Sequence, residues 1–140
     1  MAFDFGLARI GVAASDSHQI LASPVSTLKN DQHVLIQISE LLREIEPKFL
    51  VVGNPTQLSG QPGTIDMAVR DFISELKKSF PGEVYLVDER LSSRAASTQL
   101  REAGISASKQ KQSIDQQAAV NILNFVLDCI SNNKNFGQLF

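Results

Sequence analysis

Cysteine and histidine are scarce in this sequence, and it has no long apolar run. One cysteine and two histidines in 140 residues exclude a disulfide within the chain and leave no His/Cys cluster of the kind that binds zinc. The apolar runs are much shorter than the ~20 residues that span a bilayer, and no basic segment followed by an apolar one opens the sequence. We therefore expect a cytoplasmic protein with no membrane partner. Cys129 falls on an apolar helical stripe and is expected in the core.

An excess of positive charge is also missing. The formal net charge is −2 and the pI is about 5.6, so no bulk positive field attracts the chain to nucleic acid or to an anionic membrane. A polyanionic partner would need local basic residues or bound cations. With 43% apolar residues and no repeat or low-complexity segment, residues 1–140 are expected to form a single domain.

The first third of the sequence predicts an antiparallel meander followed by a helix. Short apolar runs and a glycine-bearing turn predict strands at residues 1–5 and 9–14, continued by a third at 20–28. Apolar residues at helical spacing follow Asp31, which we expect to cap the helix, and Pro47 ends it.

The middle of the sequence alternates strands and helices. The apolar run 49–53 is typical of a strand buried on both faces, and a loop rich in Pro and Gly follows it at 54–63. An amphipathic helix is predicted from about residue 65 to Pro81, and a further core strand at 84–87.

The last third predicts two helices separated by a polar segment. The first is short and ends at Gly104, residues 105–112 are expected to be mobile, and Ser113 with Gln116 forms a capping-box pattern for the last helix. We expect the tail to fray from Asn132, although its two phenylalanines can dock. This order predicts an α/β fold with a mixed sheet and helices on both faces.

Acidic residues stand at three places where strands end or helices begin. Asp4 lies in the first strand, the pair Asp88 and Glu89 ends the last core strand, and Asp115 opens the last helix. Sites in open α/β sheets gather beyond the carboxyl ends of the parallel strands, so these carboxylates are expected to converge there. Oxygen ligands without His or Cys favour Mg²⁺ or Mn²⁺, and such ions promote phosphodiester cleavage.

Each acidic position also has a simpler interpretation. Asp4 could support the turn after Gly6, Asp115 could serve the helix dipole, and the charges from Asp88 to Arg90 could form a solvated cluster. Only their combination favours a metal-dependent nuclease.

Four ordered motifs resemble the YqgF family of small bacterial Holliday junction resolvase-like proteins, viewed as pre-16S rRNA nucleases, within the ribonuclease H-like superfamily. The resemblance covers nearly the whole chain. The motifs are Asp4-Phe5-Gly6 with Arg9-Ile10-Gly11-Val12-Ala13, Val51-Val52-Gly53-Asn54-Pro55 with Gly60, Asp88-Glu89-Arg90-Leu91-Ser92-Ser93, and Ile114-Asp115-Gln116 with Ala118-Ala119.

The resemblance implies a ribonuclease H-like, five-stranded mixed sheet with three antiparallel and two parallel strands. By similarity, Asp4, Glu89 and Asp115 are the catalytic and metal-binding acids, with Asp88 as a less certain neighbour. Family members often carry a Thr-Lys pair where this chain has Leu7-Ala8. This difference leaves the loop of this chain with fewer polar contacts.

Basic residues near these acids are candidates for substrate binding. Arg9 and Arg90 flank the predicted site and could hold a phosphate in a bidentate fork. Lys109 and Lys111 could follow a nucleic-acid backbone without sequence preference, or could simply be solvated.

The expected function is therefore metal-dependent hydrolysis of structured RNA, with maturation of pre-16S rRNA ends as the task that the resemblance implies. Precursor ribosomal RNA, or ribosomal particles that contain it, would be the partner. Cleavage of branched DNA is the nearest alternative, and a ribosome-assembly factor without turnover is another. Nucleotide binding of the actin-like ATPase type is disfavoured, because the sequence has no Gly-Lys-Ser/Thr phosphate loop. The sequence does not indicate an oligomeric state.

Overall fold

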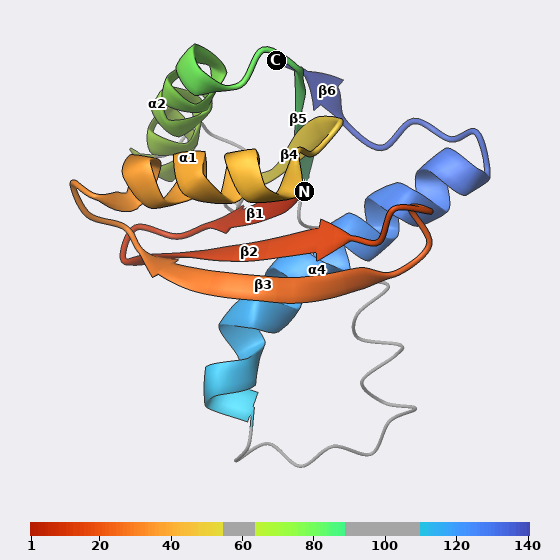
Figure 1. Ribbon diagram of the computed structural model, residues 1–140, viewed down its shortest axis with the longest axis horizontal. Coiled ribbons are helices and arrows are strands. Elements are labelled where there is room, and N and C mark those ends of the chain that lie inside the picture. The colour runs from red at the N-terminus through yellow and green to blue at the C-terminus, as the bar shows by residue number, and fades with distance from the viewer. Residues whose placement is uncertain (55–63, 89–109) are drawn as a thin grey trace.

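The computed structural model describes residues 1–54, 64–88 and 110–140, and its strands form one mixed sheet (Figure 1). The strand order is β3-β2-β1-β4-β5-β6. β1 pairs antiparallel with β2 and parallel with β4, and β4 pairs parallel with β5. The strands are β1 (Ala2–Phe5), β2 (Arg9–Ser15), β3 (Ala22–Lys29), β4 (Phe49–Asn54), β5 (Glu83–Asp88) and β6 (Gln138–Leu139).

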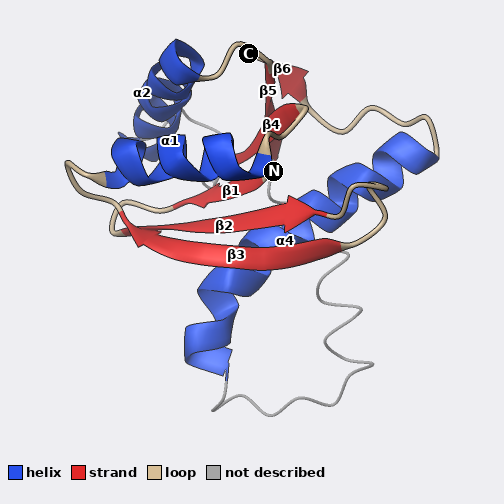
Figure 2. Ribbon diagram, viewed as in Figure 1, coloured by secondary structure: helices blue, strands red, loops and turns tan. Residues whose placement is uncertain are grey.

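Helices cover both faces of this sheet, which confirms the predicted α/β architecture (Figure 2). α1 (Val34–Ile45) and α2 (Thr64–Ser79) lie on one face, and α4 (Gln110–Ser131) crosses the other. In the described part of the chain, no helix is long and apolar enough to cross a membrane.

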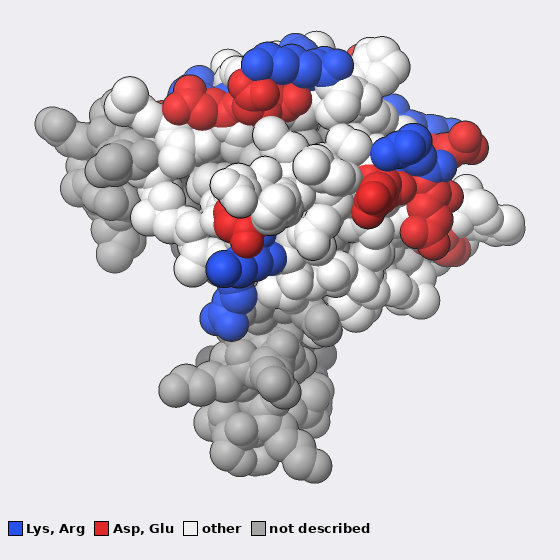
Figure 3. Space-filling model, turned by 60° about the vertical axis from the view of Figure 1, so that its left-hand side comes forward, with Lys and Arg blue, Asp and Glu red and all other residues white. Residues whose placement is uncertain are grey.

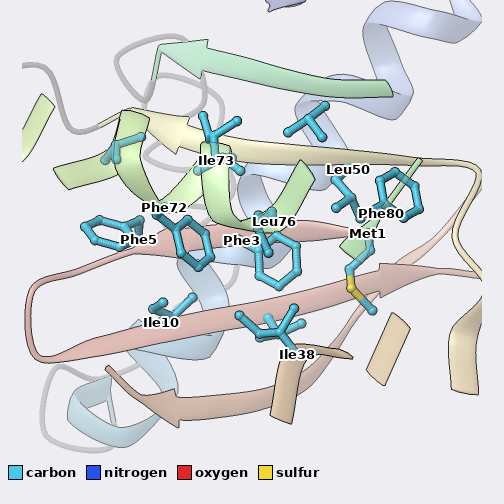
Figure 4. Close-up of a cluster of buried hydrophobic side chains, with 14 of the residues drawn as sticks. Met1, Phe3, Phe5, Ile10, Ile38, Leu50, Phe72, Ile73, Leu76 and Phe80 are labelled. Carbon is cyan, nitrogen blue, oxygen red and sulfur yellow. The ribbon is translucent and has the colours of Figure 1, made fainter. Parts of the chain in front are cut away.

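The face under α1 and α2 is packed with large side chains (Figure 4). Phe3 is fully buried, and its ring meets that of Phe72 edge-on at a centroid distance of 5.9 Å. Phe5, two residues along the same strand, lies 5.0 Å from the same ring. Strand alternation sends both residues to one face, so β1 is anchored to α2 through aromatic contacts.

The face under α4 is lined by small side chains instead. Ala2, Ala13 and Ala22 contribute one residue from each of the first three strands, and Ala119 from α4 packs into the same cluster. Ala2, Ala13 and Ala119 are fully buried. Because the separation of packed elements depends on the side chains between them, this composition lets α4 approach the sheet closely. Cys129 is buried in α4, as expected.

Two predicted helix starts were wrong. His33, not Asp31, occupies the cap of α1, and no side chain bonds there; Asp31 Oδ1 accepts the His33 N–H instead, at 2.9 Å. This bond is the main cause of a lowered Asp31 pKa. α4 begins at Gln110, so Ser113 lies inside its first turn. Lys and Gln are good helix formers, and they extend the helix past the predicted cap.

The tail is ordered rather than frayed, and it adds a sixth strand where five were predicted. β6 pairs antiparallel with β5. The Phe136 ring lies 4.9 Å from Tyr85 and 6.4 Å from Phe49. The Phe140 N–H donates to Val84 O at 2.9 Å, and its side chain packs against the larger core. Both phenylalanines therefore dock.

The turn from β1 to β2 requires glycine. The Gly6 N–H donates to Arg9 O at 2.9 Å, and a Cβ on Gly6 would lie 2.7 Å from that same backbone oxygen. Asn30 braces the turn from the end of β3, because its Nδ2 donates to Gly6 O at 2.8 Å.

Substitution of Gly6→Ala is expected to destabilise the protein by about 1–3 kcal/mol, because the new methyl group overlaps backbone that has little room to move. Leu7→Ala in the same turn is the matched control; Leu7 is 62% exposed, and its loss is expected to change the free energy of unfolding by no more than about 0.5 kcal/mol. Urea denaturation measures both values. Equal stability of the two variants would contradict the close contact.

Candidate active site at the carboxyl edge of the sheet

The predicted site lies at the edge where the three parallel strands end. β1, β4 and β5 finish there with Phe5, Asn54 and Asp88. β2 begins and β3 ends at the same edge, where Arg9 pairs with Lys29 in the register of the two strands. This is the sheet edge at which open α/β proteins place their ligands.

Asp4 has a glycine on each side. In the register of the sheet it lies opposite Gly11 of β2 and Gly53 of β4. The two residues directly opposite Asp4 therefore carry no side chain. Asp4 alternates with Phe3 and Phe5 and shares a face with Ala2, so it lies on the α4 face, where it is half-buried. Asp4 is thus a half-buried carboxylate with a glycine directly opposite it on each neighbouring strand.

Asp88 belongs to the other face. It pairs with Asn54 and comes one residue after Val87, which packs under α4, and two after Leu86, which packs under α2. Strand alternation therefore assigns Asp88 to the α2 face, opposite Asp4.

The remaining predicted site residues are described only in part. Glu89, Arg90 and Lys109 lie outside the described residues. Asp115 and Lys111 belong to the first turns of α4, of which the backbone is described. Among residues 1–54, 64–88 and 110–140, no three His, Cys, Asp or Glu side chains form a set of metal ligands. The convergence of Asp4, Glu89 and Asp115 thus stays a prediction.

Charged side chains around this edge are mixed in sign. Arg9 is exposed at the start of β2, and Lys29 pairs with Asp31 at 3.6 Å. On the face that Figure 3 shows, the described basic and acidic side chains lie in small mixed groups. Among the described residues, the basic side chains at this edge are thus accompanied by acidic ones, so their attraction for a polyanion is local.

Asn54 forms a polar contact that the sequence did not reveal. Its side chain is 9% exposed, and its Nδ2 donates to Asp66 Oδ1 at 3.2 Å in the first turn of α2. Asp66 Oδ2 accepts from Arg70 Nε at 3.0 Å. The Asn54 Oδ1 is buried and finds no donor among the described residues, a state that costs about 1–3 kcal/mol. Asn54 stood in a quoted motif, but nothing in the sequence linked it to a residue twelve positions later.

A family comparison identifies the chain. The family model described as "RuvX: Holliday junction resolvase" matches residues 1–129. The chain belongs to this family. The RuvX model thus spans all three predicted acids, and it agrees with the resemblance that the four motifs indicated.

Two relatives match the chain over most of its length. A protein of Cutibacterium acnes named "Putative pre-16S rRNA nuclease" is 43% identical over 129 residues, which cover 91% of this chain and 81% of the relative. A protein of the same name from Natranaerobius thermophilus is 39% identical over 137 residues, covering 96% and 97%. Both relatives, which align with this chain over most of their own length, are thus named as nucleases.

Solved structures agree on the fold. RuvC of Thermus thermophilus in complex with a Holliday junction substrate matches with a TM-score of 0.65 at 12% identity, over 97% of this chain and 96% of that one. A second structure of RuvC from the same organism matches with a TM-score of 0.62. At this identity the likeness shows the fold, which is the predicted ribonuclease H-like one.

Replacement of Asp66→Ala is expected to destabilise the protein by about 1–3 kcal/mol, because it leaves the buried Asn54 amide without its acceptor. The lost pair with Arg70 adds little, since that guanidinium is half-exposed. Asp71→Ala, on an exposed position of the same helix, should change stability by no more than about 0.5 kcal/mol. Denaturant midpoints of the two variants measure the difference, and matching midpoints would refute the role given to Asp66.

Proposed function

We propose that this chain is a metal-dependent endonuclease that hydrolyses phosphodiester bonds of structured RNA and matures the ends of pre-16S ribosomal RNA. The observation that carries the proposal is Asp4, half-buried at the carboxyl edge of the sheet between Gly11 and Gly53. Membership of the RuvX family and the names of the relatives support the reaction and the substrate. Such an enzyme would act in the cytoplasm, on precursor RNA or ribosomal particles that contain it.

The donor set suits Mg²⁺ or Mn²⁺. The Asp4 carboxylate is a hard oxygen ligand, and the residues directly opposite it on both neighbouring strands are glycines. Asp4, Glu89 and Asp115 would hold the metal. Asp88 is the weaker candidate, because its strand position assigns it to the opposite face. When bound, a divalent ion activates water and stabilises the charge that develops on the phosphate.

The chain's own residues bind and orient the substrate in this proposal. Asp4 stands on β1, which is hydrogen-bonded to a neighbouring strand on each side. The backbone therefore holds Asp4 in a rigid position at this edge of the sheet. Arg9, at the start of β2 and across the β1–β2 turn from Asp4, binds a phosphate beside the site. Arg90, Lys109 and Lys111 make further contacts with the nucleic-acid backbone.

Branched DNA is the second candidate substrate. The description of the matched family names Holliday junctions, and a RuvC structure with the same fold was solved on such a substrate. Comparison of a pre-16S RNA fragment with a four-way DNA junction at equal concentration distinguishes the two. We expect faster cleavage of the RNA.

Asp4→Asn is expected to lower the Mg²⁺-dependent cleavage rate by about 100-fold or more, because it removes a charged metal ligand worth several kcal/mol. Glu89→Gln should lower the cleavage rate by a similar factor. Single-turnover cleavage of the preferred substrate gives the rates, and Asp71→Asn is the control that should keep full activity.

Full cleavage by Asp4→Asn and Glu89→Gln would refute the catalytic assignment. If both variants and the metal-free protein kept full RNA binding while the wild type showed no turnover, the chain would be an assembly factor instead.

Arg9→Ala is expected to weaken substrate binding and to reduce the slope of log affinity against log salt by about 0.7–0.9, the value of one phosphate contact. Arg43→Ala is the matched control; Arg43 lies in the last turn of α1 and donates to Ser39 O of its own helix. Titrations of Asp4→Asn protein with RNA at several salt concentrations measure the slopes without cleavage. An unchanged slope in Arg9→Ala would exclude the contact.

A further inference from the structure

The buried amide of Asn54 is not explained by the fold. Asn54 is 9% exposed, and its Oδ1 is buried without a hydrogen-bond donor among the described residues. A buried acceptor without a donor lowers stability, and an apolar side chain of similar size would avoid that loss. Stability alone therefore does not account for an amide at the end of β4.

This amide connects the end of β4 to α2. Asn54 Nδ2 donates to Asp66 Oδ1 at 3.2 Å, in the first turn of the helix. A flipped amide would turn Oδ1 toward a carboxylate oxygen, so the orientation is fixed. Gly53, the preceding residue, has no side chain with which to anchor the strand. Asn54 thus supplies a directional link from the last residue of β4 to the helix layer.

The acceptor in α2 is itself held in place. Asp66 Oδ2 accepts from Arg70 Nε at 3.0 Å, and the Arg70 guanidinium lies 5.9 Å from the centre of the Phe140 ring. Phe140 is bound to β5, because its N–H donates to Val84 O. Such exposed pairs add little stability, but together they favour one orientation of the Asp66 carboxylate, the one that receives the Asn54 amide.

β4 lies between the strands that lead to two of the predicted metal ligands. Gly53 pairs with Asp4 of β1 on one side, and Asn54 pairs with Asp88 of β5 on the other. Glu89 is the residue after Asp88. A shift of the end of β4 therefore changes the spacing between the strand of Asp4 and the strand that leads to Glu89. Groups in a working site have to be held within about 0.5 Å of their productive positions.

We propose that Asn54 is a positioning residue of the nuclease site, which holds the end of β4 so that the acids on either side keep the spacing that a shared metal ion requires. The proposal rests on the proposed function. It gives the buried amide a role that needs no contact with substrate or metal. The unmet Oδ1 accompanies the donor that holds the strand.

Asn54→Leu tests this role first in protein without substrate or metal. Leucine removes the link to Asp66 but also the unmet acceptor, so the melting temperature should stay within about 4 °C of the wild-type value. Hydrogen exchange should become about tenfold faster at the amides of residues 53–54 and 87–88, where β4 and β5 end, and should not change in β2. Gln37→Leu, on the exposed face of α1, is the control and should change neither quantity.

The same variant should lower kcat for RNA cleavage about tenfold, while KM for the RNA changes less than about twofold. Isothermal titration of RNA-free protein with Mn²⁺ should show a loss of affinity of about tenfold, as for residues that orient metal ligands. A residue with a merely structural role would change the folded fraction and would leave these constants of the folded protein as they are.

Asp66→Asn is the conservative variant. It keeps an oxygen that accepts from Asn54 Nδ2, so its kcat and Mn²⁺ affinity should stay within about twofold of the wild-type values. Unchanged hydrogen exchange, kcat and Mn²⁺ affinity in Asn54→Leu would overturn the proposal and leave the nuclease assignment in place. Full cleavage by Asp4→Asn would instead overturn the nuclease assignment, whatever the exchange rates of Asn54→Leu are.

Discussion

The in-register pairing of β1 with both β2 and β4 is the constraint on which this structure depends. β1 has only four residues, yet it lies at the centre of the six-stranded sheet and is hydrogen-bonded on both sides. The register places Asp4 between Gly11 and Gly53. A shift of one residue would turn Asp4 toward the aromatic core and the phenylalanines toward α4, so the hydrophobic pattern itself enforces the position of the carboxylate.

The two faces of the sheet differ in their packing and in their proposed roles. Large side chains under α1 and α2 form the larger of the two core clusters, and the Phe3 and Phe72 rings anchor the central strand there. The α4 face is lined by alanines from the strands and by Ala119. α4 covers the same face of the sheet as Asp4, and the approach of Asp115 to Asp4 stays a prediction.

The strands and the chain order could be predicted well, because short apolar runs bounded by turns have few alternatives in a chain of this size. The ends of the helices were harder to predict. A polar residue three positions before a Gln marks a helix start only when the preceding residues cannot continue the helix, and those before Ser113 can. β6 was missed because two residues carry no periodic pattern, and only the docking of the tail phenylalanines defines that strand.

The sequence by itself determined the α/β class, the family and the candidate acids, because these follow from local patterns and from motifs that stand in a set order. Tertiary structure alone decided which face each residue occupies. It separated Asp88 from Asp4, and it joined Asn54 to Asp66 across a gap of twelve positions. Such relations depend on strand register and on helix packing, which are properties of segments distant in the chain and leave no mark on any one of them.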